Sequence, residues 1–292
     1  MCLSSGSSGN CYYLGDEDGG FLIDAGIPIR TITKTLKAEG ITLDGGHLHG
    51  AIVTHDHADH IRTIGVVGGV YHLPIYATRL VHDSIAHSRF VQDPIGPSRR
   101  DIAIREPFTL AGFTIEAFPV PHDSAENVGY HITKGDFKFT LATDVGHVTD
   151  IIEDYVGRAD HVVLEANYDR EMLRSGSYPE FLKGRVSSPL GHLSNDEAAE
   201  LLSRVYHPGM KNVWLCHLSK DNNHPDLCWK TVEQRLFSEG IRVGKDLALT
   251  ALRRTATAGF HIAQTHTLAA LAALSEAERD ALLLPCDVLV QH

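Results

Sequence analysis

The sequence predicts an α/β fold in which sheets and helices are stacked as layers, a sandwich rather than a closed barrel. Short apolar runs of strand length follow one another in the first half of the chain, and strand-like and helix-like patterns alternate in the second half. Residue types that begin and end helices or make turns separate these runs. The chain has 292 residues, of which 43% are apolar, enough for the buried core that such layers need.

The first expected elements are a β-hairpin, a helix and a buried strand. Residues 11–14 and 21–24 are β-rich runs on either side of a polar, glycine-rich turn at residues 15–20, and we expect them to pair. Pro28 is well placed as the first residue of a helix that Gly40 ends. Residues 51–54, Ala-Ile-Val-Thr, form a short apolar run typical of a buried strand.

The second half of the chain contains more strands and two clear helices. Ser194 and Glu197 form a capping box, which predicts an amphipathic helix directly after it. A second helix is expected over residues 225–239, before Gly240. The expected strands are residues 113–118, 128–133, 137–142, 161–164 and 213–216, with a hairpin turn at residues 134–136.

The last forty residues differ from the rest, because they carry no obvious catalytic group. Ser275 is expected to cap a short helix that Pro285 ends. We therefore predict one large domain over residues 1–252 and a helical tail of unknown role over residues 253–292.

Composition limits the compartment and the partners. The N-terminus has no secretory signal pattern, and no stretch has the ~18 apolar residues needed to span a bilayer. Five cysteines are an odd count without zinc-finger spacing, as expected for reduced thiols in the cytoplasm. The formal net charge of −11 argues against a uniformly basic nucleic-acid clamp, although a local basic groove remains compatible with it.

Residues 54–60, Thr-His-Asp-His-Ala-Asp-His, carry the strongest chemical signal in the chain. From a turn after a strand, His55 and His57 can point the same way, and Asp59 and His60 can reach the same region. Imidazoles and a carboxylate together suit a borderline cation such as Zn²⁺, with Mn²⁺ and Fe as alternatives. A lone histidine is usually an ordinary surface or core residue, but four ligand-type side chains so close together indicate a metal site.

This H-x-H-x-D-H stretch resembles the defining motif of the metallo-β-lactamase superfamily. The resemblance implies an αββα four-layer sandwich over residues 1–252 and two divalent metal ions per chain. It also implies a ligand set: His55, His57 and His122 for one ion, Asp59, His60 and His217 for the other, Asp144 as the bridge, and Asp24 as a support behind the ligands. Two neighbouring cations need a shared anionic ligand, which agrees with a bridging carboxylate. Taken alone, Asp144 and His217 also fit ordinary strand-end residues.

Three further stretches, residues 3–11, 191–195 and 215–223, closely resemble the bacterial WalJ/YycJ family of metal-dependent DNA exonucleases, which are related to ribonucleases Z and J. The resemblance implies that His192 faces the scissile phosphate and that Glu165 orients it. A carboxylate beside an imidazole raises its basicity and favours a protonated donor near neutral pH. The alternative is that His192 only caps a loop and Glu165 only ends a strand.

The substrate is expected to be nucleic acid, most specifically DNA, held by polar groups around the metals. The candidate contacts are Ser5, Ser7, Ser8, Asn10, Lys220 and Asn222, although serine-glycine runs are often only flexible loops. A local basic strip is also expected, because phosphate backbones are bound mostly by Lys and Arg. Its members would be Arg62, Arg79, Arg89, Arg99, Arg100 and Lys220, with Arg99 and Arg100 in a loop that overhangs the site.

The predicted reaction is phosphodiester hydrolysis by a metal-bridging hydroxide. Asp59 is both a ligand and the group that orients the hydroxide, and His192 protonates the leaving oxygen. Two alternatives remain open, because a fold does not fix a function. One is a thioesterase or lactonase of the glyoxalase II type on the same scaffold, and the other is a metal-binding regulator without turnover. Asp144 argues against a β-lactamase.

Overall fold

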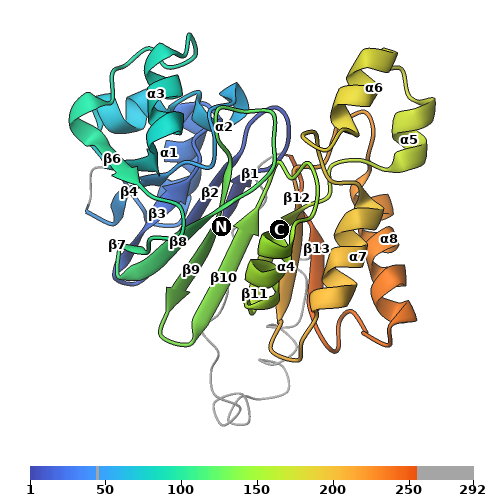
Figure 1. The fold of residues 1–292 in the computed structure, drawn as a ribbon. Coiled ribbons are helices and arrows are strands. Elements are labelled where there is room, and N and C mark those ends of the chain that lie inside the picture. The colour runs from blue at the N-terminus through green and yellow to red at the C-terminus, as the bar shows by residue number, and fades with distance from the viewer. Residues whose placement is uncertain (44–45, 255–292) are drawn as a thin grey trace, which may run out of the picture.

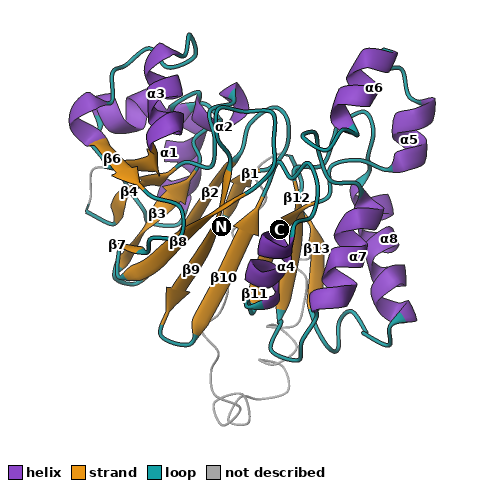
Figure 2. Ribbon diagram, viewed as in Figure 1, coloured by secondary structure: helices purple, strands orange, loops and turns teal. Residues whose placement is uncertain are grey.

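Two sheets are packed face to face, with helices on their outer sides (Figures 1 and 2). The computed structural model describes residues 1–43 and 46–254, so the predicted tail from residue 255 onward, with its helix, lies outside the described residues. The αββα four-layer arrangement confirms the predicted fold class.

The described residues form two sheets, of which the first has six strands in the order of the chain. They are β1 (Cys2–Ser4), β2 (Cys11–Asp16), β3 (Gly19–Ile23), β4 (Leu48–Ile52), β5 (Ile75–Thr78) and β6 (Arg99–Ile102). The second sheet has seven strands in the order β13 to β7. They are β7 (Phe108–Leu110), β8 (Phe113–Pro119), β9 (Val128–Lys134), β10 (Phe137–Ala142), β11 (His161–Glu165), β12 (Asn212–Cys216) and β13 (Ala248–Ala251).

The helices divide between the outer layers and the end of the sheets. On the first sheet lie α1 (Ile29–Ala38) and α3 (Arg79–His87), and on the second lie α4 (Asp150–Gly157), α7 (Asn195–Val205) and α8 (Pro225–Ser238). The short helices α2 (Ala58–Ile61), α5 (Arg170–Ser175) and α6 (Glu180–Val186) lie where strands end, and Figure 1 shows α5 and α6 raised above α7 and α8.

Three separate apolar cores hold the four layers together, and alternation along the strands assigns each side chain to one of them. In β3, Phe21 faces the second sheet and packs in the same core as Tyr130, whereas Leu22 packs with Leu36 of α1. In β11, Val163 lies in the core between the sheets, while its neighbours pack against α4 and α7. The layers are therefore encoded by period-two alternation in strands that are buried on both faces.

Most strands predicted from the sequence occur within one or two residues of the expected bounds, with two differences in the first sheet. The hairpin strands run to Asp16 and from Gly19, so the connecting turn is shorter than expected. The strand expected to end at Thr54 ends at Ile52. The reason is that the backbone N–H of Thr54 donates to the carboxylate of Asp24 at 2.8 Å instead of to a neighbouring strand.

The prediction that Arg99 and Arg100 lie in a loop is wrong. These residues begin β6, which pairs with β5 at the edge of the first sheet, two strands away from β4. A short polar edge strand has no apolar alternation, so its sequence gave no strand signal. Arg99 forms ion pairs with Asp83 and Asp101 there. The other strands that the sequence did not reveal, β1, β5, β7 and β13, are likewise only three or four residues long.

Candidate metal centre

The predicted metal ligands converge at one end of the two sheets, where parallel strands finish. β3 and β4 are parallel in the first sheet, and β10, β11 and β12 are parallel in the second. The carboxyl ends of such strands are the usual place for a ligand site in an α/β fold. His55, His57, Asp59 and His60 lie in the segment from the end of β4 through α2. His122 lies in the β8–β9 connection, and Asp144 and His217 follow the ends of β10 and β12.

His55, His57 and His122 form the first group, in which one ring nitrogen of each lies within 4.8 Å of the others. The Nδ1 of His57 is 3.3 Å from the Nε2 of His122. His55 is fully buried, and its Nε2 has no hydrogen-bond partner among the described residues. Because an unpaired buried polar atom is costly, this nitrogen is expected to bind a group that the described residues do not supply, such as a cation.

Asp59, His60 and His217 form the second group, with the same spacing between ligand atoms. The Oδ2 of Asp59 is 3.6 Å from the Nε2 of His60 and 3.5 Å from the Nε2 of His217. Two imidazole nitrogens and one carboxylate oxygen thus face a common point.

Asp144 lies between the two groups and presents one carboxylate oxygen to each. Its Oδ1 is 3.5 Å from the Nε2 of His122, and its Oδ2 is 3.3 Å from the Nε2 of His60. The side chain is buried, and among the described residues its ion-pair partners are all histidines. This geometry suits a bridging carboxylate.

Asp24 holds the second group from behind. Its Oδ2 lies 2.7 Å from the Nδ1 of His60 and accepts a hydrogen bond from the Thr54 hydroxyl at 2.9 Å. Because Asp24 engages Nδ1 of His60, the Nε2 of that ring points toward Asp144 and Asp59. A carboxylate behind a histidine in this way orients the ring and increases its basicity as a ligand.

Three site residues have left-handed backbone conformations that only glycine adopts without cost. The φ angles are 61° at Asp24, 56° at Asp144 and 55° at His217. Each residue directly follows or nearly follows a strand, and the left-handed bend turns its side chain back over the end of the sheet. Asp, Asn and His tolerate this region better than most residues, at a cost of about 1–3 kcal/mol each. Backbone strain of this kind commonly occurs at functional sites.

The loop that bears the metal motif is docked closely on the first sheet. The carbonyl oxygen of Asp59 accepts from the N–H of Asn10 at 2.7 Å, and that of His60 accepts from Ala25 at 2.8 Å. A Cβ atom at Gly26 would lie 1.6 Å from the carbonyl oxygen of Asp59, so only glycine permits this approach.

Glu165 pairs with His192 and also with one of the predicted ligands. Its Oε1 lies 2.9 Å from the Nδ1 of His192 and 2.8 Å from the Nδ1 of His217. Its Oε2 accepts from the backbone N–H groups of Val145 and Leu193. The sequence anticipated the contact with His192 but not the second contact, which makes Glu165 a support for His217 as well.

Buried carboxylates dominate the electrostatics of the site. Burial alone would favour a neutral imidazole, but Asp144, Asp59 and Glu165 outweigh it and raise the pKa of His217 to about 10. For His192 burial is likewise outweighed, chiefly by Glu165, so that its pKa is raised. Conversely, burial and then the neighbouring His60 keep the pKa of His55 well below its usual range. Surroundings that hold protons on histidines this strongly also attract cations, which replace those protons on binding.

The serine-rich N-terminal loop divides into buried and exposed residues. Ser5 is fully buried, and its Oγ accepts from the hydroxyl of Tyr12 and from the backbone N–H of His217, both at 2.9 Å. Asn10 is also buried, with its Nδ2 2.9 Å from the Nε2 of His60. Ser7 and Ser8 are exposed. The buried residues of the loop therefore contact His217 and His60, whereas Ser7 and Ser8 at its tip are exposed to solvent.

The two candidates after β12 also differ in exposure. Lys220 is exposed. Asn222 is buried: its Nδ2 lies 3.4 Å from the Oγ of Ser219, and its Oδ1 has no partner among the described residues.

Three residues that the sequence reasoning missed contact the site. The Oδ1 of Asp123 is 3.4 Å from the Nε2 of His122, and its Oδ2 accepts from the Nε of Arg185 at 2.6 Å. Asn167 donates to the carbonyl oxygen of His217 at 2.8 Å. Adjacency to His122 was an available signal for Asp123, whereas Arg185 comes from a distant helix and had none.

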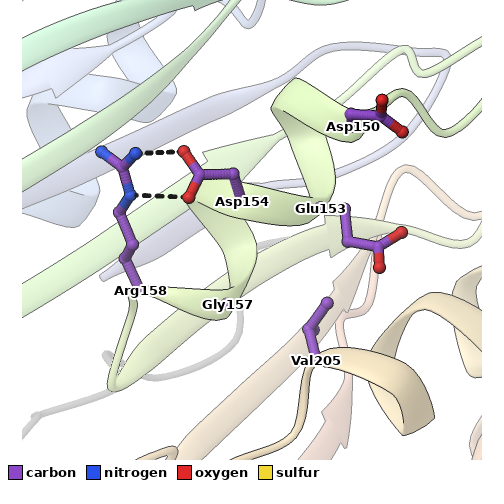
Figure 3. A pocket seen from close by; sticks show the side chains of 6 residues that line it. All are labelled: Asp150, Glu153, Asp154, Gly157, Arg158 and Val205. Carbon is purple, nitrogen blue, oxygen red and sulfur yellow. Dashed lines mark hydrogen bonds and ion pairs between the residues drawn. The ribbon is translucent and has the colours of Figure 1, made fainter.

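The structure places the members of the predicted basic strip on several different elements. Arg62 follows α2 and donates from Nη1 to the carbonyl oxygen of Ser8 at 3.5 Å, and Lys220 follows β12. Arg79, Arg89, Arg99 and Arg100 lie on α3, just after it, or on β6, and Arg79 and Arg99 form ion pairs with Asp83. A separate open hollow between α4 and Val205 (Figure 3) includes none of the predicted site residues. Its acidic lining includes Asp154, which binds Arg158 on the same helix.

Comparisons with known proteins place the chain among hydrolases of one superfamily. A family model described as a β-lactamase superfamily domain matches residues 20–218. The exodeoxyribonuclease WalJ of Streptococcus pneumoniae is 37% identical over 244 residues, 84% of this chain and 90% of that protein. The exodeoxyribonuclease YycJ of Bacillus anthracis is 33% identical over 243 residues, 83% of this chain and 90% of that one.

A solved structure shares the fold. The metallo-β-lactamase fold protein YhfI from Bacillus subtilis superposes with a TM-score of 0.63 at 17% identity, covering 87% of this chain and 96% of that one. A stretch of 67 residues, 22% of this chain, is also 64% identical to 22% of tRNA pseudouridine synthase B from Neisseria gonorrhoeae. Such a partial match brings no activity of that enzyme to this chain. Within the described residues, no helix is long and apolar enough to cross a membrane.

Proposed function

This chain belongs to the metallo-β-lactamase superfamily and, within it, to the WalJ/YycJ family, and on that premise we propose that it is a two-metal phosphodiesterase acting as a DNA exonuclease. Membership makes the chain a hydrolase. The observation that carries the finer proposal is the contact of His192 with Glu165, 2.9 Å long, beside both ligand groups. An alkoxide is a poor leaving group and needs a proton donor, whereas a thiolate leaves readily without one.

We propose that the two histidine-carboxylate groups hold two divalent ions, Zn²⁺ or alternatively Mn²⁺ or Fe²⁺. The unpaired Nε2 of buried His55 and the surplus of buried carboxylates support this. One ion would bind to His55, His57 and His122, the other to Asp59, His60 and His217, with Asp144 shared. Bound there, the ions would supply an activated water and positive charge for the phosphoryl oxygens.

Residues of the chain then orient the attacking water and protonate the leaving oxygen. Asp59, whose Oδ2 lies 3.3 Å from the Nδ2 of Asn10, orients the attacking water. The Nδ1 of His192 faces Glu165, which leaves its Nε2 without a described partner and free to protonate the leaving oxygen. Glu165 cannot rotate away, because two backbone N–H groups hold its other oxygen. His192 is thus held as a donor in one orientation.

We propose that substrate oxygens meet the exposed rim of this site. Ser7, Ser8 and Lys220 are exposed there, and Asn10 and Asn222 lie beneath them as buried amides. Ser5 contributes indirectly, through its hydrogen bond to the backbone of His217. Its oxygen accepts both of its hydrogen bonds, so its O–H is still available as a donor, but the side chain is fully buried and a direct substrate contact would require it to become accessible.

The test is a cleavage panel with the full chain loaded with Zn²⁺ or Mn²⁺. The substrates are 5′-phosphorylated single- and double-stranded DNA, RNA, a cyclic phosphodiester, a thioester and nitrocefin. We expect mononucleotides to be released from DNA ends, with little turnover of the thioester or nitrocefin. Turnover of the thioester without cleavage of any phosphodiester would replace this proposal with the glyoxalase II-type alternative.

A further inference from the structure

We propose that α6 is the element that grips the incoming DNA strand: Phe181 stacks on a base, and Arg185 binds a neighbouring phosphate of the same strand. This inference rests on the proposed function and identifies how a polymer, rather than a small phosphodiester, is recognised. It concerns residues outside the metal ligands and outside the His192–Glu165 pair.

Phe181 and Arg185 share one face of α6, because residues four apart in a helix lie about one turn above one another, roughly 6 Å along the axis. Phe181 is 78% exposed, the largest exposed fraction among the described large apolar side chains. No residue of α6 is buried. A single exposed apolar residue is ordinary, but an aromatic ring aligned with a cation is the pair that single-stranded nucleic acid binds.

Arg185 lies at the end of α6 that is nearer the metal groups. Its Nε donates to Asp123, whose other oxygen is 3.4 Å from His122 and 3.9 Å from His57. Among the described residues, no acceptor contacts the two Nη groups of Arg185. Asp123 therefore fixes the guanidinium beside the site and leaves its outer edge available for a phosphate, which Arg binds with two parallel hydrogen bonds.

The segment from α6 to His192 links this face directly to the proposed chemistry. The N–H of His192 donates to the carbonyl oxygen of Val186 at 2.8 Å, and Gly191 N–H donates to Ser188. The carbonyl oxygen of Gly191 lies 2.9 Å from the Nδ1 of His122. A Cβ at Gly191 would lie 2.2 Å from the carbonyl oxygen of Val186, so glycine is required for this tight closure. Arg185 and His192 thus stand at the two ends of one rigid loop.

The free edge of the Arg185 guanidinium next to an exposed aromatic ring suits a single nucleic-acid strand as the occupant of this face. The chain has a net charge of −11, and Arg79 and Arg99 of the predicted basic strip are paired with Asp83, so we expect few phosphate contacts. Arg185 is held by Asp123, which contacts two of the predicted ligand histidines. A single phosphate contact and a single stack would give modest affinity with a shallow salt dependence.

The experiment measures KM and kcat for 5′-phosphorylated single-stranded DNA, together with anisotropy of a labelled oligonucleotide, at several salt concentrations. Phe181→Ala and Arg185→Ala are each expected to weaken binding and raise KM about tenfold. Arg185→Ala should also reduce the slope of log Kd against log salt by about 0.7, the value for one phosphate contact on a single strand.

Matched controls distinguish the loss of a specific DNA contact from the general effect of removing an exposed side chain. Phe237→Ala removes another aromatic side chain, 64% exposed on α8, and Arg174→Ala removes an exposed arginine of α5. Both should leave KM within twofold of wild type. Phe181→Tyr should retain binding and Phe181→Leu should not, because leucine keeps apolar area but cannot stack. Arg185→Lys should restore the salt slope but only part of the affinity.

Three results would overturn the inference. The first is that the Phe181 and Arg185 variants match their controls. The second is full oligonucleotide binding by Phe181→Leu, which would show that no base stacks on this ring. The third is loss of metal from Arg185→Ala, which would make Arg185 a support for His122. The proposed function fails separately, if wild type hydrolyses no DNA. Oligonucleotide binding still decides the inference in that case.

Discussion

Asp24 and Glu165 are carboxylates at corresponding places in the two sheets, but they contact different numbers of histidines. Both are fully buried at the carboxyl end of a strand, and both accept a hydrogen bond from a backbone N–H. Asp24 engages one histidine, His60, and the Thr54 hydroxyl beside it. Glu165 engages two, His217 and His192.

We interpret this difference as a division between metal binding, supported by Asp24, and the proposed proton transfer, supported by Glu165. The first sheet contributes a compact group of ligands from one short segment, and its carboxylate only supports that group. The second sheet contributes ligands singly, from separate connections, and its carboxylate connects a ligand to the proposed proton donor. We therefore expect substitutions behind the first sheet to affect metal affinity, and those behind the second to affect turnover as well.

The largest effect is expected from Asp144→Ala, since Asp144 presents one oxygen to His122 of the first ligand group and the other to His60 of the second. Loss of the shared carboxylate should remove at least one ion and reduce kcat/KM by about 10³-fold or more. Elemental analysis and hydrolysis of DNA measure this. Wild-type metal content in this variant would show that neither ion depends on a shared carboxylate.

His192→Ala should separate chemistry from metal binding most cleanly. We expect unchanged metal content and fold, with kcat lowered roughly 10²–10⁴-fold, the usual effect of removing a positioned proton donor. The loss should be smaller for a substrate whose leaving group needs no proton, such as a 4-nitrophenyl phosphodiester. If His192→Ala loses an ion, then His192 is a ligand and its proposed role as the acid is wrong.

Asp24→Asn and Glu165→Gln test the comparison directly. Each should weaken metal binding about 10–100-fold, because each supports a ligand histidine. At saturating metal, Asp24→Asn should regain nearly wild-type kcat, whereas Glu165→Gln should remain impaired because a neutral amide no longer raises the pKa of His192. Equal recovery of both variants would remove the functional difference between the two sheets.

The smallest expected effect lies at the opposite end of β11 from Glu165. His161 stacks on Phe137 and near Trp214, and burial, with Lys211 nearby, lowers its pKa to about 4 from 6.5. The unfolded chain takes up this proton first as pH falls, so folding stability should decrease between about pH 6.5 and 4. His161→Phe should reduce that decrease by roughly 2 kcal/mol, as followed by urea unfolding. An unchanged pH dependence would assign the loss of stability to the metal-site residues instead.

The comparison also explains what the sequence could predict. The ligands of the first sheet are adjacent in sequence, so residues 55–60 indicated a metal site from residue types alone. The ligands of the second sheet are separated by many residues, and only the family resemblance singled out His122, Asp144 and His217. The contact of Glu165 with His217 depends on the register of β11 and β12, which sequence does not specify.

The errors have similar physical origins. β6 was missed because its pairing with β5, rather than its own residues, makes it a strand. Arg185 was missed because it reaches the site from a helix whose sequence carries no metal or phosphate motif. Long, apolar strands and capped helices were predicted well, since their signals are local.

The most direct test of the two-metal account is the metal-to-protein ratio of the full chain after reconstitution with excess Zn²⁺ or Mn²⁺ and removal of unbound metal. The convergence of His55, His57 and His122 on one side and of Asp59, His60 and His217 on the other, with Asp144 between them, predicts a ratio of about two. A ratio of one or less in folded protein would contradict it.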